Sequence, residues 1–439
     1  MKLLIYVPQI TPRINYIFDF ILTDLLGVPY IITDRLNKFF EPSIIKIQYS
    51  PNYTSIPNCL FIKANKLLFE EDIKQQKIEI SNWHETKVFF QTGEQSFIPF
   101  DIFAAGFYLL SRYEEYLPFK PDKYGRFGAN QSLAFKHNFI EQPVIDMWVG
   151  YFKSELLKHY PELKFKERKF RFISTIDIDN AYAYLHKEIF RSLLSSAKLI
   201  FNFKWDEFIE KISVHQGKSK DPYDSYQFLQ EIHSEYNVQS IYFFLTAKYA
   251  KNDKNISPDN KPFKQLVELI SEYTEIGIHP SYASNKNTDI VNSEKEKLEK
   301  LSGKVISKSR QHFLMLKFPE TYRNLIKLGI TEDYSMGYAS VTGFRAGTCT
   351  PFYFFDLEAD KSEKLKIIPF ALMDVGLKEY NKLGSEDAIK EIEKIIENVK
   401  KVKGLFVSLW HNESLGNKSK WKNWKLTYER MIQYALNGN

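Results

Sequence analysis

Apolar runs and helical periodicity alternate along the second half of the chain. Strands are predicted at 172–179, 240–247, 276–282, 305–314, 330–335, 367–374 and 405–413. Helices are predicted at 187–214, 224–235, 262–275, 290–301, 319–328 and 384–401. Strands that alternate with helices of this length are typical of βαβ units and a parallel sheet. About 270 residues of such units is the size of a (β/α) barrel, here distorted or incomplete.

An open doubly wound sheet is the alternative arrangement of the same elements. No GxGxxG motif follows the first of these strands, which weakens a nucleotide-binding interpretation.

The first half has a different pattern, with the short apolar runs LLIYVP, YIITD, CLFIKA and KVFFQT. One long helical pattern begins after Asp101, which is a suitable N-cap. The charged stretch KFKERKFRF at 164–172 separates the halves. We therefore predict an α/β protein with a smaller mixed α/β domain of unknown role at 1–165 and the barrel domain at 170–439, since 439 residues exceed the size of one core.

Composition narrows the class of protein. The chain has 60 Lys or Arg and 54 Asp or Glu, a net charge of +6 without a dense basic block, which argues against a nucleic-acid partner. Cys59 and Cys349 form no paired motif, as in a reducing compartment. The first apolar run is short and is broken by Pro8, and no later run approaches the ~18 residues of a transmembrane segment. We expect a soluble cytoplasmic protein, and the sequence gives no indication of oligomeric state.

Reactive side chains fall at the ends of five predicted strands. The stretch TIDIDNAY ends the first one with Asp177 and Asp179, which point to the same face because strand side chains alternate. The other strand ends supply His279, the pair Arg310 and His312, Asp374 and His411. Chemistry in (β/α) barrels gathers at the carboxyl ends of the strands, so we expect these side chains to converge.

Taken singly, each of these residues is a weak signal, because a lone Asp often caps a helix and a lone His is often bonded in a core. Together they form a cluster of the metal or catalytic type. A His–His–Asp set suits Zn²⁺ or another first-row divalent ion and leaves a position for water. A base and an acid must then move protons, and Asp177 and His411 are free for these roles.

The motifs between residues 170 and 415 resemble those of the polysaccharide deacetylases, the NodB-homology or carbohydrate esterase family 4 group. The segment TIDID resembles the family's first motif, which implies Asp177 as the base and Asp179 as a metal ligand. The segment EIGIHPSYAS resembles the second motif, HxxxH, and implies His279 as a metal ligand. The family is built on a distorted β/α barrel, so the resemblance implies the same fold here.

Later motifs continue the resemblance in the same order. Arg310 resembles the arginine that orients the base, and TEDYSMG at 331–337 resembles the segment that follows it. LWHNE resembles the last motif, which implies His411 as the acid, with Asp374 as the residue that tunes it. The first half resembles an uncharacterised domain found ahead of divergent deacetylase-like domains.

One position departs from the family pattern. Four residues after His279 the family has a second metal-binding His, and this chain has Ala283. His312 from the neighbouring strand is the favoured replacement, because a hydrolytic Zn²⁺ site requires a third His, Asp or Glu. The alternatives are a second-shell role for His312, weak binding by two ligands and water, or a site that has lost its metal.

The resulting prediction is a metal-dependent hydrolase that removes an N-acetyl or other N-acyl group from an amino sugar or saccharide. The metal is expected to be Zn²⁺, with Co, Ni or Fe as alternatives. The expected substrate contacts are Tyr282, Trp410 and Arg345, although Arg345 in GFRAGTCTPF also fits a loop tied by an arginine. The other functions considered are a saccharide-binding protein without catalysis and a hydrolase of another non-peptide C–N bond.

Overall fold

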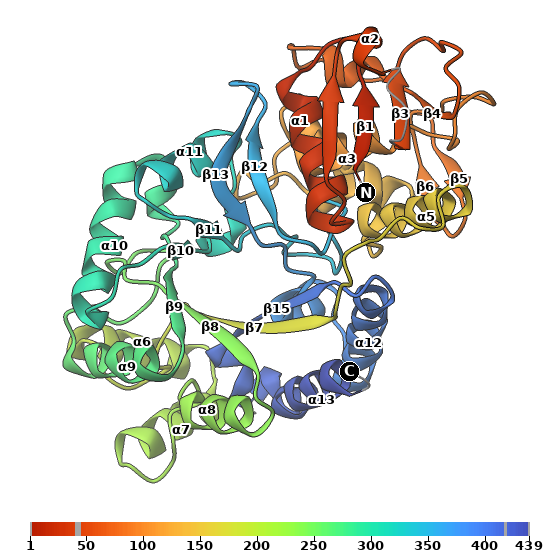
Figure 1. Ribbon diagram of the computed structural model, residues 1–439. Coiled ribbons are helices and arrows are strands. Elements are labelled where there is room, and N and C mark those ends of the chain that lie inside the picture. The colour runs from red at the N-terminus through yellow and green to blue at the C-terminus, as the bar shows by residue number, and fades with distance from the viewer. Residues whose placement is uncertain (1, 40–44, 417–418, 438–439) are drawn as a thin grey trace.

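A computed structural model of the protein describes residues 2–39, 45–416 and 419–437. Each half of the chain builds its own mainly parallel sheet with helices packed around it (Figure 1). Buried apolar side chains from both halves join in one continuous cluster. The architecture is therefore mixed α/β in both halves, as the alternation of apolar runs predicts. No helix in the described part of the chain is long and apolar enough to cross a membrane.

The first sheet has four parallel strands in the order β2-β1-β3-β4. Its strands are β1 (Leu3–Tyr6), β2 (Tyr30–Thr33), β3 (Ile45–Ser50) and β4 (Cys59–Lys63). A separate antiparallel hairpin consists of β5 (Ser81–Trp83) and β6 (Thr86–Val88). The sequence analysis missed β3, because Lys46 and Gln48 interrupt its apolar pattern although both are buried.

The helices of the first half cover this sheet and connect its strands. They are α1 (Pro12–Phe18), α2 (Leu36–Phe39), α3 (Ile102–Leu110), α4 (Leu133–Lys136) and α5 (Val144–His159). Asp101 caps α3 as predicted, since its Oδ1 accepts hydrogen bonds from the backbone N–H groups of Phe103 and Ala104 at 3.0 Å each. The helix ends at Leu110, where Arg112 adopts a left-handed conformation (φ 54°).

The second sheet has the order β12-β13-β11-β10-β9-β8-β7-β15-β14, with every pair parallel except β12 and β13. Its strands are β7 (Arg171–Ile178), β8 (Gln239–Phe244), β9 (Glu275–Ile278), β10 (Lys308–Ser309), β11 (Glu332–Asp333), β12 (Phe352–Asp356), β13 (Lys361–Ile367), β14 (Leu372–Met373) and β15 (Leu405–His411). Among the described residues the edge strands β12 and β14 do not pair, so the expected barrel is not closed by a strand ladder.

One segment spans the gap that a closed barrel would fill. Residues 361–367 pair with β11, and the Ile368 N–H donates to the Asp333 carbonyl at 2.8 Å. A few residues later the Ala371 N–H donates to the Val407 carbonyl of β15 at 3.0 Å, and β14 then pairs with β15. The segment 367–374, which was expected to be one strand, therefore connects β13 beside β11 to β14 beside β15.

Helices α6 (Ile189–Phe201) to α13 lie between and around the strands of the second sheet. The others are α7 (Trp205–His215), α8 (Tyr226–Glu235), α9 (Lys261–Tyr273), α10 (Thr288–Ser302), α11 (Glu320–Lys327), α12 (Ser385–Lys401) and α13 (Trp424–Leu436). The helix predicted at 187–214 is two helices, because the chain turns at Phe203, which has φ 55°. The strand predicted at 305–314 contains only the two residues of β10, since backbone turns follow at Phe313 and Leu314.

Two buried acids of the first half bind the second half. The Glu115 carboxylate accepts hydrogen bonds from Arg112 at 2.8 Å and from the Arg345 Nε at 2.9 Å. Asp146 accepts from Thr348 Oγ1 at 2.6 Å and from Thr350 Oγ1 at 2.5 Å. The segment that contains Arg345 is thus held between the two halves.

Candidate metal centre

The two acids of TIDID lie at the carboxyl end of β7, between β15 and β8. Asp177 is opposite His411 in the register of β15, and Asp179 follows the last residue of the strand. The His279 Nε2 lies 3.0 Å from Asp179 Oδ1 and 3.8 Å from Asp177 Oδ2. Both carboxylates therefore face the same space.

His279 follows β9 and presents one ring nitrogen to the acids. Its Nδ1 lies 2.6 Å from the Arg310 carbonyl oxygen. A carbonyl only accepts, so Nδ1 carries the proton and donates it, and Nε2 keeps its lone pair. This second hydrogen bond fixes the ring in the form that a metal ion requires.

His312 is oriented in the same way by a buried carboxylate. Its Nδ1 lies 2.8 Å from Asp253 Oδ1, and its Nε2 lies 3.3 Å from Asp179 Oδ2. Burial alone would lower the pKa of His312, but Asp179 and Asp253 outweigh this effect and raise it to about 9. A cation that binds here must displace the proton held on His312.

Asp179, His279 and His312 together offer one ligand atom each, all within 4.8 Å of one another. Burial would raise the pKa of Asp179, yet the charge of the neighbouring His312 holds it well below its usual value. The Asp179 Oδ1 atom is buried and accepts no hydrogen bond. An acceptor without a donor beside the lone pair of His279 fits a cation, so the residues present suit a divalent metal ion.

Arg310 lies behind Asp177 and is fully buried. Its Nη1 donates to Asp177 Oδ1 at 2.9 Å and to Thr175 Oγ1 at 2.7 Å, and its Nε donates to the Tyr334 carbonyl at 2.9 Å. The guanidinium is thus the ion-pair partner of the Asp177 carboxylate. Asp177 is thereby fixed next to the three potential ligands without being one of them.

His411 approaches the same space from the end of β15. Its Nδ1 lies 2.8 Å from Asp374 Oδ1, its backbone N–H donates to Asp374 Oδ2 at 2.9 Å, and its Nε2 is 3.7 Å from Asp179 Oδ2. Burial would lower the pKa of His411, but Asp374 raises it well above its ordinary value. The imidazolium form is thus stabilised on the side opposite Arg310.

Asp253 is the residue of this site that the sequence analysis missed. It is an isolated acid in the polar loop KYAKNDKN after β8, where nothing distinguishes it from solvated neighbours. The loop brings it under Tyr282 and Ala283, whose N–H groups donate to its two oxygens at 2.8 and 3.3 Å. Its place after a predicted strand end is the one signal by which it could have been found.

Aromatic rings line the site on the side of His312. Tyr282, which the sequence analysis expected to contact substrate, lies 5.5 Å from the Phe313 ring between centroids. Tyr124 from the first half lies 5.0 Å from the same ring, and Arg126 Nη1 donates to the Phe313 carbonyl at 2.8 Å. The first half of the chain therefore contributes to the surroundings of the site.

Two residues expected at the substrate are elsewhere. Arg345 is buried in its ion pair with Glu115, at 2.5 Å between Nη2 and Oε2. Trp410 is fully buried on the opposite face of β15 from His411, with its ring 4.9 Å from that of Tyr428. Both are core side chains, because a strand alternates its faces and an arginine paired with a buried acid is not free to bind a ligand.

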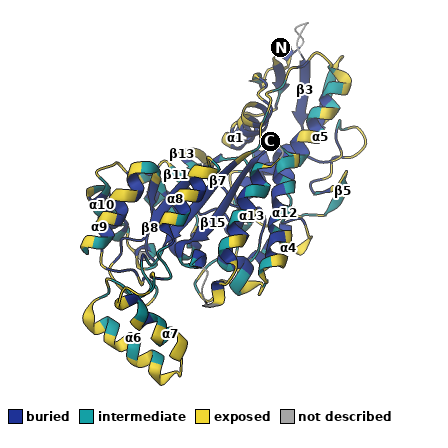
Figure 2. Cartoon of the chain, turned by 90° about the horizontal axis from the view of Figure 1, so that it is seen from below, coloured by how far each residue is buried: buried dark blue, intermediate teal, exposed yellow. Residues whose placement is uncertain are grey.

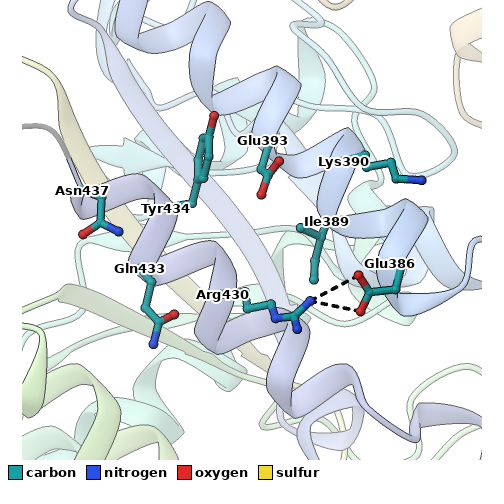
Figure 3. Close-up of a pocket in the computed structure, with 8 residues that line it drawn as sticks. All are labelled: Glu386, Ile389, Lys390, Glu393, Arg430, Gln433, Tyr434 and Asn437. Carbon is teal, nitrogen blue, oxygen red and sulfur yellow. Dashed lines mark hydrogen bonds and ion pairs between the residues drawn. The ribbon is translucent and has the colours of Figure 1, made fainter.

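A hollow of about 420 Å³ on the outer surface lies between α12 and α13 (Figure 3). Arg430 and Glu386 form an ion pair of 3.0 Å across it, and none of the site residues described above lines it. The hollow is therefore separate from the metal centre.

The chain was compared with family models, curated protein sequences and solved structures. Residues 3–161 match a family of unknown function, DUF7033. No curated protein sequence matches the chain. Among solved structures, a candidate polysaccharide deacetylase from Mycobacterium smegmatis aligns over 63% of this chain and 87% of its own, with 14% identity and a TM-score of 0.42.

Two further structures align over a similar share of the chain. The polysaccharide deacetylase Bc1974 from Bacillus cereus covers 62% of this chain and 87% of its own, with 15% identity and a TM-score of 0.29. A CE4 family pseudoenzyme from Bacillus anthracis covers 61% of this chain and 60% of its own, with 8% identity and a TM-score of 0.29.

Proposed function

We propose that the protein is a metal-dependent amide hydrolase that removes an N-acetyl or other N-acyl group from an amino sugar. One observation carries the proposal: His279 and His312 both direct Nε2 toward Asp179 while each Nδ1 bonds a protein acceptor. Two histidines and an acid held in this way are the ligand set of a hydrolytic metal site with an open position.

In this proposal Asp179, His279 and His312 hold a divalent ion, with Zn²⁺ the first candidate and Co, Ni or Fe the others. When bound, the ion lowers the pKa of a water molecule and polarises the amide carbonyl. His312 thus replaces the ligand that Ala283 does not provide. Asp253 is its orienting partner.

The remaining residues move protons. Asp177, held in place by Arg310, takes the proton of the attacking water at its Oδ2, the oxygen on the side of His279. His411, kept protonated by Asp374, donates the proton on Nε2 to the departing amine. The proposed base and acid lie on the paired strands β7 and β15, so the scissile bond would lie between their ends.

The aromatic side of the site supports a sugar substrate. The Phe313 ring lies 4.6 Å from that of His312, and the rings of Tyr282 and Tyr124 both contact Phe313. Aromatic rings bury the apolar faces of ligands while backbone and hydroxyl groups supply hydrogen bonds. The N-terminal domain would in this way help to select the saccharide.

Acetate release from N-acetylated saccharides tests the proposal. The purified protein should release acetate in the presence of Zn²⁺ or Co²⁺, and His411→Ala should lower kcat at least a hundredfold. His159→Ala, at the exposed end of α5, is the matched control and should not change the rate. Equal rates in His411→Ala and the parent protein would exclude the proposed acid.

Metal content separates this proposal from a saccharide-binding protein that lacks catalysis. Elemental analysis of protein purified without chelators should find about one divalent ion per chain, and His312→Ala should lose it while His137→Ala keeps it. Protein that holds no metal, gains no thermal stability from added metal and still binds saccharide would favour the binding function. A substrate panel that includes ureides tests the remaining alternative, hydrolysis of another C–N bond.

A further inference from the structure

Helices α6 and α7 form a hairpin that projects from the body of the second half and is largely exposed (Figure 2). Among the described residues, α6 buries no side chain. Ile189 is 80% exposed, Phe201 83% and Phe203, in the turn between the helices, 79%. In α7, Trp205 is 50% exposed and Ile209 is 62% exposed. Exposed apolar side chains that gather in one place mark an interaction site.

The hairpin packs with its polar side inward. Lys211 of α7 is buried, and its Nζ donates to the Ser192 carbonyl at 2.6 Å, to Ser195 Oγ at 2.6 Å and to Ser196 Oγ at 2.8 Å. The exposed apolar residues of α6 recur at helical spacing on the other side, at positions 189, 190, 193, 194, 200 and 201. The serines of α6 thus face α7, and its apolar stripe faces solvent. An apolar helix face in this position is suited to contact with an apolar partner outside the protein.

Positive charge surrounds these apolar residues. Residues 186–220 and the loop 248–254 hold ten Lys or Arg and five Asp or Glu, so they carry +5 of the chain's net +6. Arg191 joins the two segments, because its Nη2 donates to the Lys254 carbonyl and its guanidinium lies 4.0 Å from the Tyr249 ring. We call residues 186–220 and 248–254 the hairpin patch.

The hairpin patch borders the metal centre at two points. Its loop contains Asp253, the acid that orients His312, between the exposed Lys251 and Lys254. Its first helix begins ten residues after Asp179. The loop and the start of α6 therefore adjoin the proposed active site, while the rest of the hairpin projects away from it (Figure 2).

We propose that the hairpin patch binds the surface of an anionic lipid bilayer. Interfacial helices have an apolar face with Phe, Leu or Trp beside basic residues, and they lie in the plane of the headgroups without crossing the membrane. Juxtaposed lysines attract anionic headgroups, whereas a patch of net +5 repels a second copy of itself. Charge thus favours a membrane over self-association as the partner of this surface.

Together with the proposed hydrolase activity, on which this step rests, membrane docking indicates a substrate that is itself held at the bilayer. The acyl group would belong to an amino sugar linked to a lipid, whose headgroup reaches the metal centre when the hairpin patch is docked.

Vesicle binding tests the docking apart from any activity. The intact protein should sediment with vesicles of phosphatidylcholine and phosphatidylglycerol, at least tenfold more strongly than with phosphatidylcholine alone, and added salt should weaken the binding. Phe190→Ser/Phe201→Ser and Lys248→Glu/Lys251→Glu should each reduce binding about tenfold. Val305→Ser, which removes an apolar side chain that is 86% exposed elsewhere, and Lys390→Glu are the matched controls and should bind like the parent.

Three results would overturn the docking proposal. They are failure of the parent protein to bind anionic vesicles, equal binding by the patch variants and their controls, and a concentration-dependent dimer that the patch variants abolish in analytical ultracentrifugation. Acetate release from a soluble N-acetylated sugar with no vesicle binding would leave the hydrolase proposal standing and exclude docking. Vesicle binding by a protein without hydrolysis or metal would do the reverse.

Discussion

The metal centre and the hairpin patch depart from the usual distribution of side chains in opposite directions. The centre buries carboxylates and imidazoles that normally lie in water, and the patch leaves Phe, Leu and Ile in water. In the centre each charge has a partner, such as Arg310 for Asp177 and Asp253 for His312. In the patch the apolar stripe of α6 has none in the described part of the chain.

The difference indicates the size of what each region binds. Among the proposed ligand atoms of the centre, Asp179 Oδ1 is buried without a hydrogen-bond donor, which suits one small cation. In the patch a whole helix face is left uncovered, which suits an extended surface. A group of side chains left without partners therefore indicates both that a ligand binds there and how large that ligand is.

The largest effect is expected from Asp177, the proposed general base of the metal centre. Asp177→Asn should lower kcat for acetate release 10²–10⁴-fold, about 3–5 kcal/mol, because the amide cannot take a proton from water. Metal content should stay that of the parent protein, since Asp177 is not proposed as a ligand. The exposed Asp259→Asn is the control, and loss of metal together with activity would place Asp177 among the ligands instead.

A buried titratable group outside the centre gives the next effect. His233 of α8 lies 2.6 Å from Tyr428 Oη, and burial lowers its pKa to about 4. Between pH 6.5 and 4 the unfolded chain binds the proton first, so stability falls as the pH falls, by about 3 kcal/mol over this range.

Urea unfolding at several pH values measures this loss. His233→Gln should reduce the acid-induced decrease by about that amount, and His159→Gln should leave the pH profile unchanged. Identical profiles for His233→Gln and the parent protein would show that His233 does not remain neutral in the folded state.

A smaller effect is expected at Asp253, which hydrogen-bonds to His312. Asp253→Asn should weaken Zn²⁺ binding 10–100-fold in a competition with a chromophoric chelator, because His312 loses the carboxylate that fixes its ring. Unchanged affinity would show that the orientation of His312 does not depend on Asp253, and Asp289→Asn is the exposed control.

The smallest effect is expected in the hairpin patch. Leu193→Ser, at a position that is 63% exposed, should change the free energy of unfolding by less than about 0.5 kcal/mol while it weakens vesicle binding. Trp410→Ala, in the core behind the metal centre, should cost about 3–5 kcal/mol. A large loss of stability in Leu193→Ser would show that the stripe is covered within the protein itself.

Local sequence pattern predicted the strands and the reactive residues that share a strand end. Asp177 and Asp179 were found because alternation fixes their common direction, and His411 because an apolar run stops at it. His279 and Arg310 were found in the same way. Their convergence follows from parallel strands, which bring their carboxyl ends to one edge of a sheet.

Long-range partners were beyond this kind of reasoning. Asp253 reaches His312 because two loops meet only in the folded chain. Arg345 pairs with Glu115, which is 230 positions away in the sequence, and so does not lie in the site. The exposure of α6 was hidden for the same reason. An amphipathic pattern predicts a helix with one apolar face, but it does not say whether that face meets the core.

The carboxylate of Asp221 gives the hairpin patch a further property. Asp221 accepts hydrogen bonds from the N–H groups of Ala183, Tyr184 and Leu185 at 2.8 to 3.0 Å, so the strands of chain that enter and leave the hairpin are joined at its base. Because this fastening lies between the hairpin and the sheet, a change of length between Ile189 and His215 can be absorbed within the hairpin without moving β7 or β8.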